Sequence, residues 1–242
     1  MKTVALLGGM TYEASALYYK IINGYVRKQL GGRYSAPLIL HSFNFHPLLA
    51  AMNQGHWDVV ADRFVDAASH MKAAGAEGLV ICANYPHKIA DVVEQRSGMH
   101  VLHIADLTAE EIVRCGKRKV GLLGMKMVME EDYIKGRMKE RYGIDVLVPL
   151  EQDARDSIHN ELMSNLPSGR VTPELRRLLI QSSRAMIDDG AEGIILGSTD
   201  LAFALKPDDV EVPLFDTNLV HAEGVARWLL GDGADPFAWA RR

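Results

Sequence analysis

The chain has 242 residues and a formal net charge of −4, with acidic and basic residues mixed along its length. This length fits one large domain or two small ones. No long lysine or arginine run points to nucleic acid, and two cysteines without a CxxC motif do not form a disulfide framework. The sequence carries neither a signal-like start nor a membrane-length apolar run, so we expect a soluble cytoplasmic protein without nucleic-acid or membrane partners.

Eight short runs of mostly valine, isoleucine and leucine recur along the chain. Runs that are apolar at successive positions are typical of strands buried on both faces of a parallel sheet. They are Val4–Leu7, Pro37–His41, Leu79–Cys82, Val101–Ile104, Val120–Leu123, Val146–Leu150, Ile194–Leu196 and Val212–Phe215.

Helical patterns separate most of these runs. Tyr12–Leu30 and Trp57–Ala74 are amphipathic and stop at glycines. Thr172–Asp189 opens with Thr-Pro-Glu, which is typical of a capped helix start, and also stops at a glycine. Strands that alternate with helices of this length predict an α/β fold.

The order of these elements repeats. VALLGGM at Val4–Met10 matches VGLLGMK at Val120–Lys126, and both this pair and the pair Cys82 and Ser198 lie 116 residues apart. The pattern GAEG precedes both of the latter residues, with one extra residue before Ser198. We therefore predict two pseudo-symmetric parallel-sheet α/β domains, the first formed by residues 1–105 plus 207–242 and the second by residues 106–206.

Polar residues follow several of the predicted strands. Ligands of such folds bind at the carboxyl ends of the strands. Two equivalent units that face each other would gather Gly8–Thr11, Cys82–Asn84, Gly124–Lys126 and Ser198–Asp200 around one cleft, where we expect the active site.

The turn Gly8–Thr11 has two interpretations. Its glycines let the backbone approach a ligand, and the helix that follows presents amide groups to an anion. Alternatively, it is a tight turn with Thr11 as the helix N-cap. It matches neither GxGxxG nor the P-loop pattern, which argues against dinucleotides and nucleoside triphosphates.

Cys82 is the candidate base. A thiol at a helix N-terminus can have a lowered pKa and form a thiolate near neutrality, whereas a cysteine in an apolar strand is often inert. The polar residues Asn84 and His87 follow Cys82 closely and favour a functional thiol, whereas Cys115 lacks such polar neighbours at the end of a strand. For Ser198 and Thr199, helix capping and carboxylate binding are favoured over proton abstraction, because an unactivated hydroxyl is a weak base.

The histidines lack the spacing of a metal site. His100 and His103 flank a predicted strand and would point to opposite faces. His87 and His221 lie near strand ends, where each is either functional or a buried, hydrogen-bonded histidine.

Several blocks of sequence resemble the aspartate/glutamate racemase family. LLGGMTYEASALYYKIIN is similar to the family's opening block, and ICANYPHKIAD to its C-T-N-T-x-H-K motif. LHIADLTAEEI, VGLLGMKMVMEEDYIKGR and PLFDTNLVHAEGVA follow its later blocks. The resemblance implies two α/β domains with the site between them, a homodimer, and racemisation of an amino acid without pyridoxal phosphate, metal or other cofactor.

The resemblance also implies roles for individual residues. Two family cysteines face the substrate α-carbon from opposite sides; Cys82 matches the first, whereas Ser198 stands at the second and Asp200 stands where glutamate is usual. The residues that match its substrate-binding positions are Gly9, Met10, Thr11, Ala83, Asn84, Gly197 and Thr199.

The implied reaction is thiolate abstraction of the α-proton of aspartate, glutamate or a related amino acid. The basic residues that hold a second carboxylate in aspartate-specific members have no clear counterpart here. Because one thiol is missing, a one-base isomerase or decarboxylase stays open, as does a ligand-binding homologue without turnover.

Overall fold

The computed structural model of the chain describes residues 1–165, 171–199 and 201–231. Two compact units are present: unit 1 contains residues 1–107 and the chain from His221 on, and unit 2 contains residues 108–220. Residues 207–220, which we had expected in the first unit, belong to unit 2. The reason is that strand β7 (Leu214–Asp216) pairs in parallel with strand β6 (Ile194–Gly197) of that unit.

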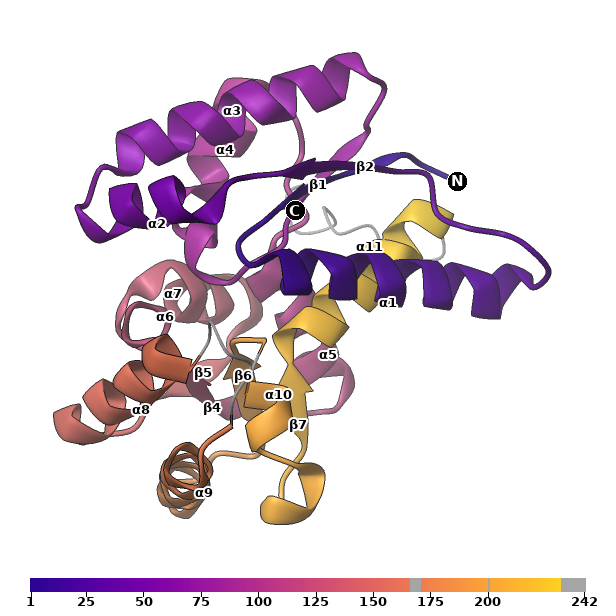
Figure 1. Cartoon of the computed structure of the whole chain (residues 1–242). Helices are drawn as coiled ribbons and strands as arrows, with labels where there is room; N and C mark the ends of the chain where they lie inside the picture. The colour runs from indigo at the N-terminus through magenta and orange to yellow at the C-terminus, as the bar shows by residue number, and fades with distance from the viewer. Residues whose placement is uncertain (166–170, 200, 232–242) are drawn as a thin grey trace. The chain divides into compact units, whose positions relative to one another are not determined.

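Unit 1 contains a parallel sheet of strand order β2-β1-β3. In Figure 1, α1 and α11 cover one face of this sheet and α3 and α4 cover the other. The elements that begin in unit 1 are β1 (Val4–Gly8), α1 (Tyr12–Leu30), β2 (Leu38–Ser42), α2 (Phe45–Asn53), α3 (Trp57–Ala73), β3 (Gly78–Ile81), the 3₁₀ helix η1 (Tyr85–Ile89), α4 (Ala90–Ser97) and α5 (Ile104–Arg114).

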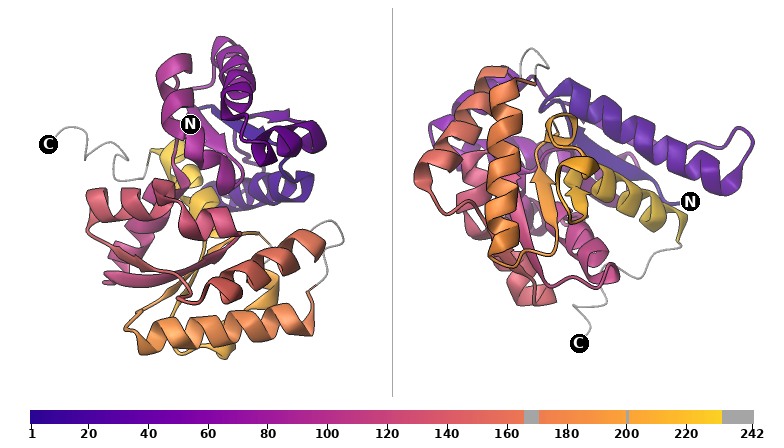
Figure 2. Two further views of the ribbon diagram at one scale, coloured as in Figure 1. Left: turned by 90° about the vertical axis from the view of Figure 1, so that its left-hand side faces the viewer. Right: turned by 90° about the horizontal axis from the view of Figure 1, so that it is seen from below.

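Unit 2 contains a parallel sheet of strand order β5-β4-β6-β7. Helix α9 packs beside α8 along one face of that sheet (Figure 2). The remaining elements are β4 (Lys119–Gly124), α6 (Lys126–Glu130), α7 (Asp132–Tyr142), β5 (Asp145–Leu147), α8 (Gln152–Asn165), α9 (Pro173–Asp188), β6, α10 (Leu201–Ala204), the 3₁₀ helix η3 (Pro207–Asp209), β7 and α11 (Thr217–Leu230).

The predicted α/β fold with two parallel sheets is confirmed, with one exception among the eight predicted strands. The run Val101–Ile104 contributes a single bridge, between Val101 and Leu79. The chain then leaves the sheet, because the Ile104 amide donates to the His87 ring and begins α5. Helix α1 matches the predicted range, and Thr172 caps α9 by accepting the Leu175 amide at 3.0 Å.

The internal repeat extends to the pairing of the strands. Ala5 of β1 lies opposite Leu79 of β3, and Gly121 of β4 lies opposite Ile194 of β6. Ala5 and Gly121 are equivalent in the first repeat block, and Leu79 and Ile194 each follow the shared GAEG pattern. The pairs β1–β3 and β4–β6 therefore have the same register.

The core of unit 1 lies between α1, α11 and the sheet. Its fully buried members include Tyr18 and Ile22 of α1, Val80 of β3 and Val225 of α11, and Cys82 belongs to the same cluster. Among the described residues, no helix is long and apolar enough to cross a membrane.

Candidate active site

In each sheet the strand order reverses beside the first strand of the unit. The reversal lies between β1 and β3 in unit 1 and between β4 and β6 in unit 2. Such a switch point is where open α/β sheets bind ligands, next to the carboxyl ends of the strands.

The predicted site residues fall into two groups at these switch points. Gly8–Thr11 and Cys82–Asn84 follow β1 and β3, and Gly124–Lys126 and Gly197–Thr199 end or follow β4 and β6. Asp200 lies outside the described residues. The structure thus places one group in each unit, and their meeting in one cleft stays a prediction.

The turn after β1 is held by a residue that sequence reasoning missed. The Gly9 amide donates to the Ser15 hydroxyl at 2.7 Å, and this hydroxyl donates to the Thr11 carbonyl at 3.1 Å. Thr11 precedes α1, but its side chain makes no capping hydrogen bond. Because the Gly9 amide is already bonded, an anion at this turn would meet the amides that follow it at the start of α1.

Gly9 itself is required by the path of the chain. Its φ of 87° lies in the region that favours glycine, and a Cβ at this position would lie 2.3 Å from the Phe43 carbonyl oxygen. The only sequence signal for Ser15 was a serine four residues after Thr11, on the side of α1 that carries buried residues.

Cys82 directly follows β3 and is 1% exposed. Its amide donates to the Leu7 carbonyl at 2.9 Å, which continues the ladder with β1. Burial raises the pKa of the thiol well above its ordinary value. The expected lowering of this pKa is wrong for the structure as it stands, because burial outweighs any effect of the short 3₁₀ helix that begins at Tyr85. The resting group is a neutral thiol.

The turn after Cys82 is bonded to His87. The Nδ1 atom of His87 lies 2.8 Å from the Ala83 carbonyl oxygen, and the His87 amide donates to the Asn84 carbonyl at 3.2 Å. The Ile104 amide donates to the Nε2 atom of His87 at 3.2 Å. Asn84 is buried and Ala83 is partly exposed.

His221 of α11 is also a buried, hydrogen-bonded residue. Its Nε2 atom lies 2.7 Å from the Leu102 carbonyl oxygen and its Nδ1 atom 2.7 Å from the Tyr18 hydroxyl. Burial lowers the pKa of the ring to about 4. Both His87 and His221 are therefore buried, hydrogen-bonded histidines, as one of the two alternatives predicts.

His100 and His103 have different surroundings, although the residues between them do not form the predicted strand. The Nδ1 atom of His100 lies 3.2 Å from a carboxylate oxygen of Glu94 near the surface. His103 is buried and stacks edge to face on His87. Among the described residues, no group of three histidine, cysteine or acidic side chains could hold a metal ion.

In unit 2 the equivalent turn is one residue longer. Gly197 lies opposite Gly124 as the last residue of β6, so by strand pairing Gly197 is the counterpart of Cys82. A Cβ at Gly197 would lie 2.9 Å from the Leu123 carbonyl oxygen. Ser198 and Thr199 follow outside the strand and are partly exposed. The extra residue noted in the repeat is thus accommodated where β6 ends.

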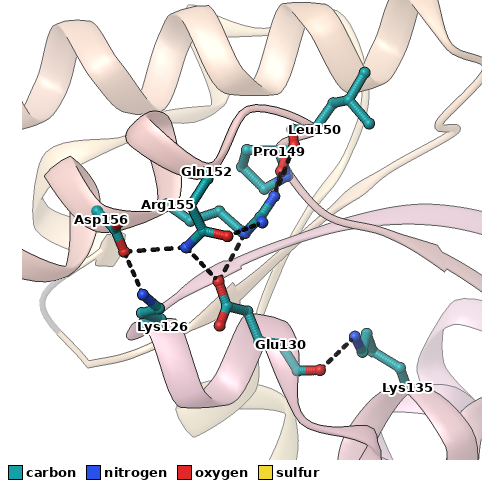
Figure 3. A network of polar contacts seen from close by, with 8 residues as sticks. All are labelled: Lys126, Glu130, Lys135, Pro149, Leu150, Gln152, Arg155 and Asp156. Atoms are coloured by element: carbon teal, nitrogen blue, oxygen red, sulfur yellow. Dashed lines mark hydrogen bonds and ion pairs between the residues drawn. The ribbon is translucent and has the colours of Figure 1, made fainter.

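A charged network surrounds the turn after β4 (Figure 3). The Lys126 ammonium lies 2.6 Å from the Asp156 carboxylate, which raises the pKa of Lys126 and lowers that of Asp156. The Arg155 Nε donates to Glu130 at 2.9 Å, and Gln152 bonds both Glu130 and Asp156. Lys126 is thus paired with Asp156 and Arg155 with Glu130, while Lys135 donates to the Glu130 carbonyl, so Lys126 is not a spare positive charge for a substrate.

Comparison with known proteins identifies the family of the chain. A model of the Asp/Glu/Hydantoin racemase family matches residues 7–225. The chain belongs to this family.

Solved structures agree with this assignment. A Yersinia pestis protein provisionally assigned as an Asp/Glu racemase is 37% identical over 95% of this chain and 100% of its own, with a TM-score of 0.90. An aspartate racemase homologue from Pyrococcus horikoshii is 30% identical over 96% of this chain and 98% of its own, with a TM-score of 0.80. Picrophilus torridus aspartate racemase shares the fold at 16% identity and a TM-score of 0.68, over 96% and 94% of the two chains.

Proposed function

We propose that this member of the family is a cofactor-independent amino-acid racemase in which Cys82 exchanges the α-proton. The observation that carries the proposal is the position of Cys82, which ends the β3 ladder at the switch point of unit 1 beside Asn84. In the proposal, Gly9–Thr11, Ala83 and Asn84 bind the substrate from unit 1, and Gly197 and Thr199 bind it from unit 2. Ser198 faces the second side of the α-carbon.

The neutral thiol must release its proton to water before it can accept one from the substrate. An amino acid bound with its α-carbon against Cys82 would bring its own ammonium group close to the sulfur. A cation within about 4–6 Å favours the charged form of an acid, and therefore lowers a thiol pKa. We infer that the substrate assists in forming the thiolate, and that Cys82 stays protonated until an amino acid is bound.

The proposed substrate is aspartate, glutamate or a related amino acid. The names of the similar proteins favour an acidic side chain, whereas the balanced charges around Lys126 give it no separate support. We further propose a cytoplasmic homodimer that needs no pyridoxal phosphate or metal.

A one-base reaction is the second candidate, and the residues at the two strand ends favour it. A neutral buried thiol is a proton donor, and Ser198 offers no second thiol. Such a site suits a decarboxylase or isomerase that protonates a carbanion from one side only. A homologue that binds without turnover would have no use for the thiol.

Proton NMR of L- and D-amino acids in D2O separates these functions. Racemisation replaces the α-proton by deuterium and also produces the other enantiomer. Deuterium incorporation with retained configuration would support the one-base reaction. Neither exchange nor inversion with any amino acid of the panel, despite measurable binding, would contradict the proposed racemase.

A further inference from the structure

Two buried histidines of unit 1, His103 and His221, contact the buried His87 next to the turn that carries Cys82. The ring centre of His87 lies 4.6 Å from that of His103 and 5.6 Å from that of His221, both in edge arrangements. All three side chains are at most 4% exposed. None of them has a part in the proton transfer proposed above.

The partners of His87 determine which nitrogen carries its proton. A carbonyl oxygen only accepts hydrogen bonds, so Nδ1 must donate to Ala83. A backbone amide only donates, so Nε2 must accept from Ile104. A second ring proton, on Nε2, would face the Ile104 amide, so that two donors would oppose each other. It would also place a positive charge at the N-terminus of α5, where the helix dipole disfavours one. His87 therefore has no lone pair left for catalysis.

His87 bonds both residues that follow Cys82. Its ring bonds the Ala83 carbonyl and its amide bonds the Asn84 carbonyl, while the far side of the ring is fixed to α5. The main chain that orients the thiol and the Asn84 amide thus depends on one ring of defined tautomer.

We propose that His87 is a positioning residue, which orients Cys82 and Asn84 through its hydrogen bond to the Ala83 carbonyl. The proposal rests on the proposed role of Cys82 in catalysis. A misplacement of about 1 Å at a reacting group can lower a rate by about a hundredfold. A residue that fixes this turn should therefore affect turnover more than it affects substrate binding.

Two substitutions separate the two hydrogen bonds of the ring. In His87→Asn, the amide nitrogen can take the place of Nδ1 and keep the bond to Ala83. In His87→Gln, the amide oxygen can take the place of Nε2 and keep the bond from Ile104. Each variant loses one buried hydrogen bond, so their melting temperatures should fall by similar amounts.

We expect His87→Gln to lower kcat for α-proton exchange about 10- to 100-fold with KM changed by less than about threefold. His87→Asn should stay within about fivefold of the wild type. Tyr18→Phe is the control, because it removes the hydroxyl bonded to His221 at 2.7 Å and leaves the Ala83 turn intact. Equal losses in His87→Asn and His87→Gln, or losses no greater than in Tyr18→Phe, would overturn the proposal.

A second measurement does not depend on activity. In a Cys115→Ala background, Cys82 is the only thiol, and its alkylation rate reports how often the turn opens. We expect alkylation about tenfold faster in His87→Gln and near the wild-type rate in His87→Asn. If the wild type exchanges no α-proton, the proposed function fails, but these rates still decide the role of His87. Equal rates in both variants would refute it.

Discussion

The pKa of Cys82 is the property on which the local sequence pattern and the tertiary structure disagree most. Its spacing to the next helix predicted a thiolate, but the buried cluster to which it belongs includes side chains of α1 and α11, which are distant in sequence. Burial by such residues cannot be inferred from the neighbours of a cysteine along the chain. The sequence therefore indicates Cys82 as a candidate residue but does not indicate its protonation state.

Replacing the two cysteines one at a time tests the catalytic assignment. Cys82→Ala should abolish α-proton exchange, by at least about a thousandfold, because no other described thiol lies at either switch point. Cys115→Ala should change the rate by less than about twofold, since Cys115 is exposed just after α5. Exchange that survives in a folded Cys82→Ala protein would remove Cys82 from the mechanism.

His221 should make the stability of the protein depend on pH. Its folded pKa of about 4 lies below the ordinary value of 6.5, so the unfolded chain binds the proton more readily. The stabilisation is complete above about pH 6.5 and is lost as the pH falls towards 4, by on the order of 3 kcal/mol. Urea unfolding from pH 4.5 to 7.5 measures this loss.

The control for this titration is His221→Gln, which cannot ionise and whose amide nitrogen can still donate to the Leu102 carbonyl. The free energy of unfolding of the wild type should fall more steeply with acid than that of the variant. Parallel curves would show that His221 does not contribute to acid sensitivity.

At the scale of elements, the turn between β1 and α1 depends on the Ser15 hydroxyl. Ser15→Ala removes the acceptor of the Gly9 amide and the donor to the Thr11 carbonyl. We expect a loss of about 1–3 kcal/mol in the free energy of unfolding and a several-fold rise in KM, because the turn proposed to bind substrate loosens. Chemical denaturation and exchange kinetics measure the two effects.

Ser183→Ala is the matched control for Ser15→Ala. The Ser183 hydroxyl is also buried, but has no hydrogen-bond partner among the described residues, so its removal should leave stability unchanged or raise it. A Ser15→Ala protein as stable and as active as Ser183→Ala would show that the hydrogen bond between the Gly9 amide and the Ser15 hydroxyl contributes to neither stability nor activity.

The helices were predictable where residues next to their ends in the sequence mark those ends. The glycine after Leu30 ends α1, and Thr172 caps α9. The run Val101–Ile104 has the same apolar character as the true strands, yet a distant side chain, His87, bonds its last amide and starts a helix there. The repeat likewise predicted equivalent sites and showed one extra residue before Ser198, and strand pairing identified Gly197 as the counterpart of Cys82.

At the scale of the whole molecule, the two units carry unlike groups, Cys82 and Ser198, at the turns that we propose to bind the substrate. A racemase must serve both faces of a planar carbanion, and a donor is most effective when its pKa lies near the working pH. A serine hydroxyl is far from this range, whereas a thiol can be tuned to it. We expect the wild type to exchange the α-proton of one enantiomer readily and to invert it more slowly.

Ser198→Cys should raise inversion relative to exchange by about tenfold or more, because it supplies the second thiol. Ser198→Ala is the control and should not raise the ratio of inversion to exchange. Inversion and deuterium exchange are followed in D2O from each enantiomer. Fast and equal inversion in both directions by the wild type would show that a competent second acid is already present.

The discontinuity of unit 1 has a consequence for biosynthesis. A ribosome completes all of unit 2 before it adds the chain from His221 on, which supplies Ala222, Val225 and Trp228 to the core of unit 1. Domains generally fold as units while the chain grows. Tyr18 and Cys82 are therefore made before unit 2 but gain their last neighbours only after all of unit 2 has been made. Unit 1 begins to be synthesised before unit 2 and can complete its core only after it.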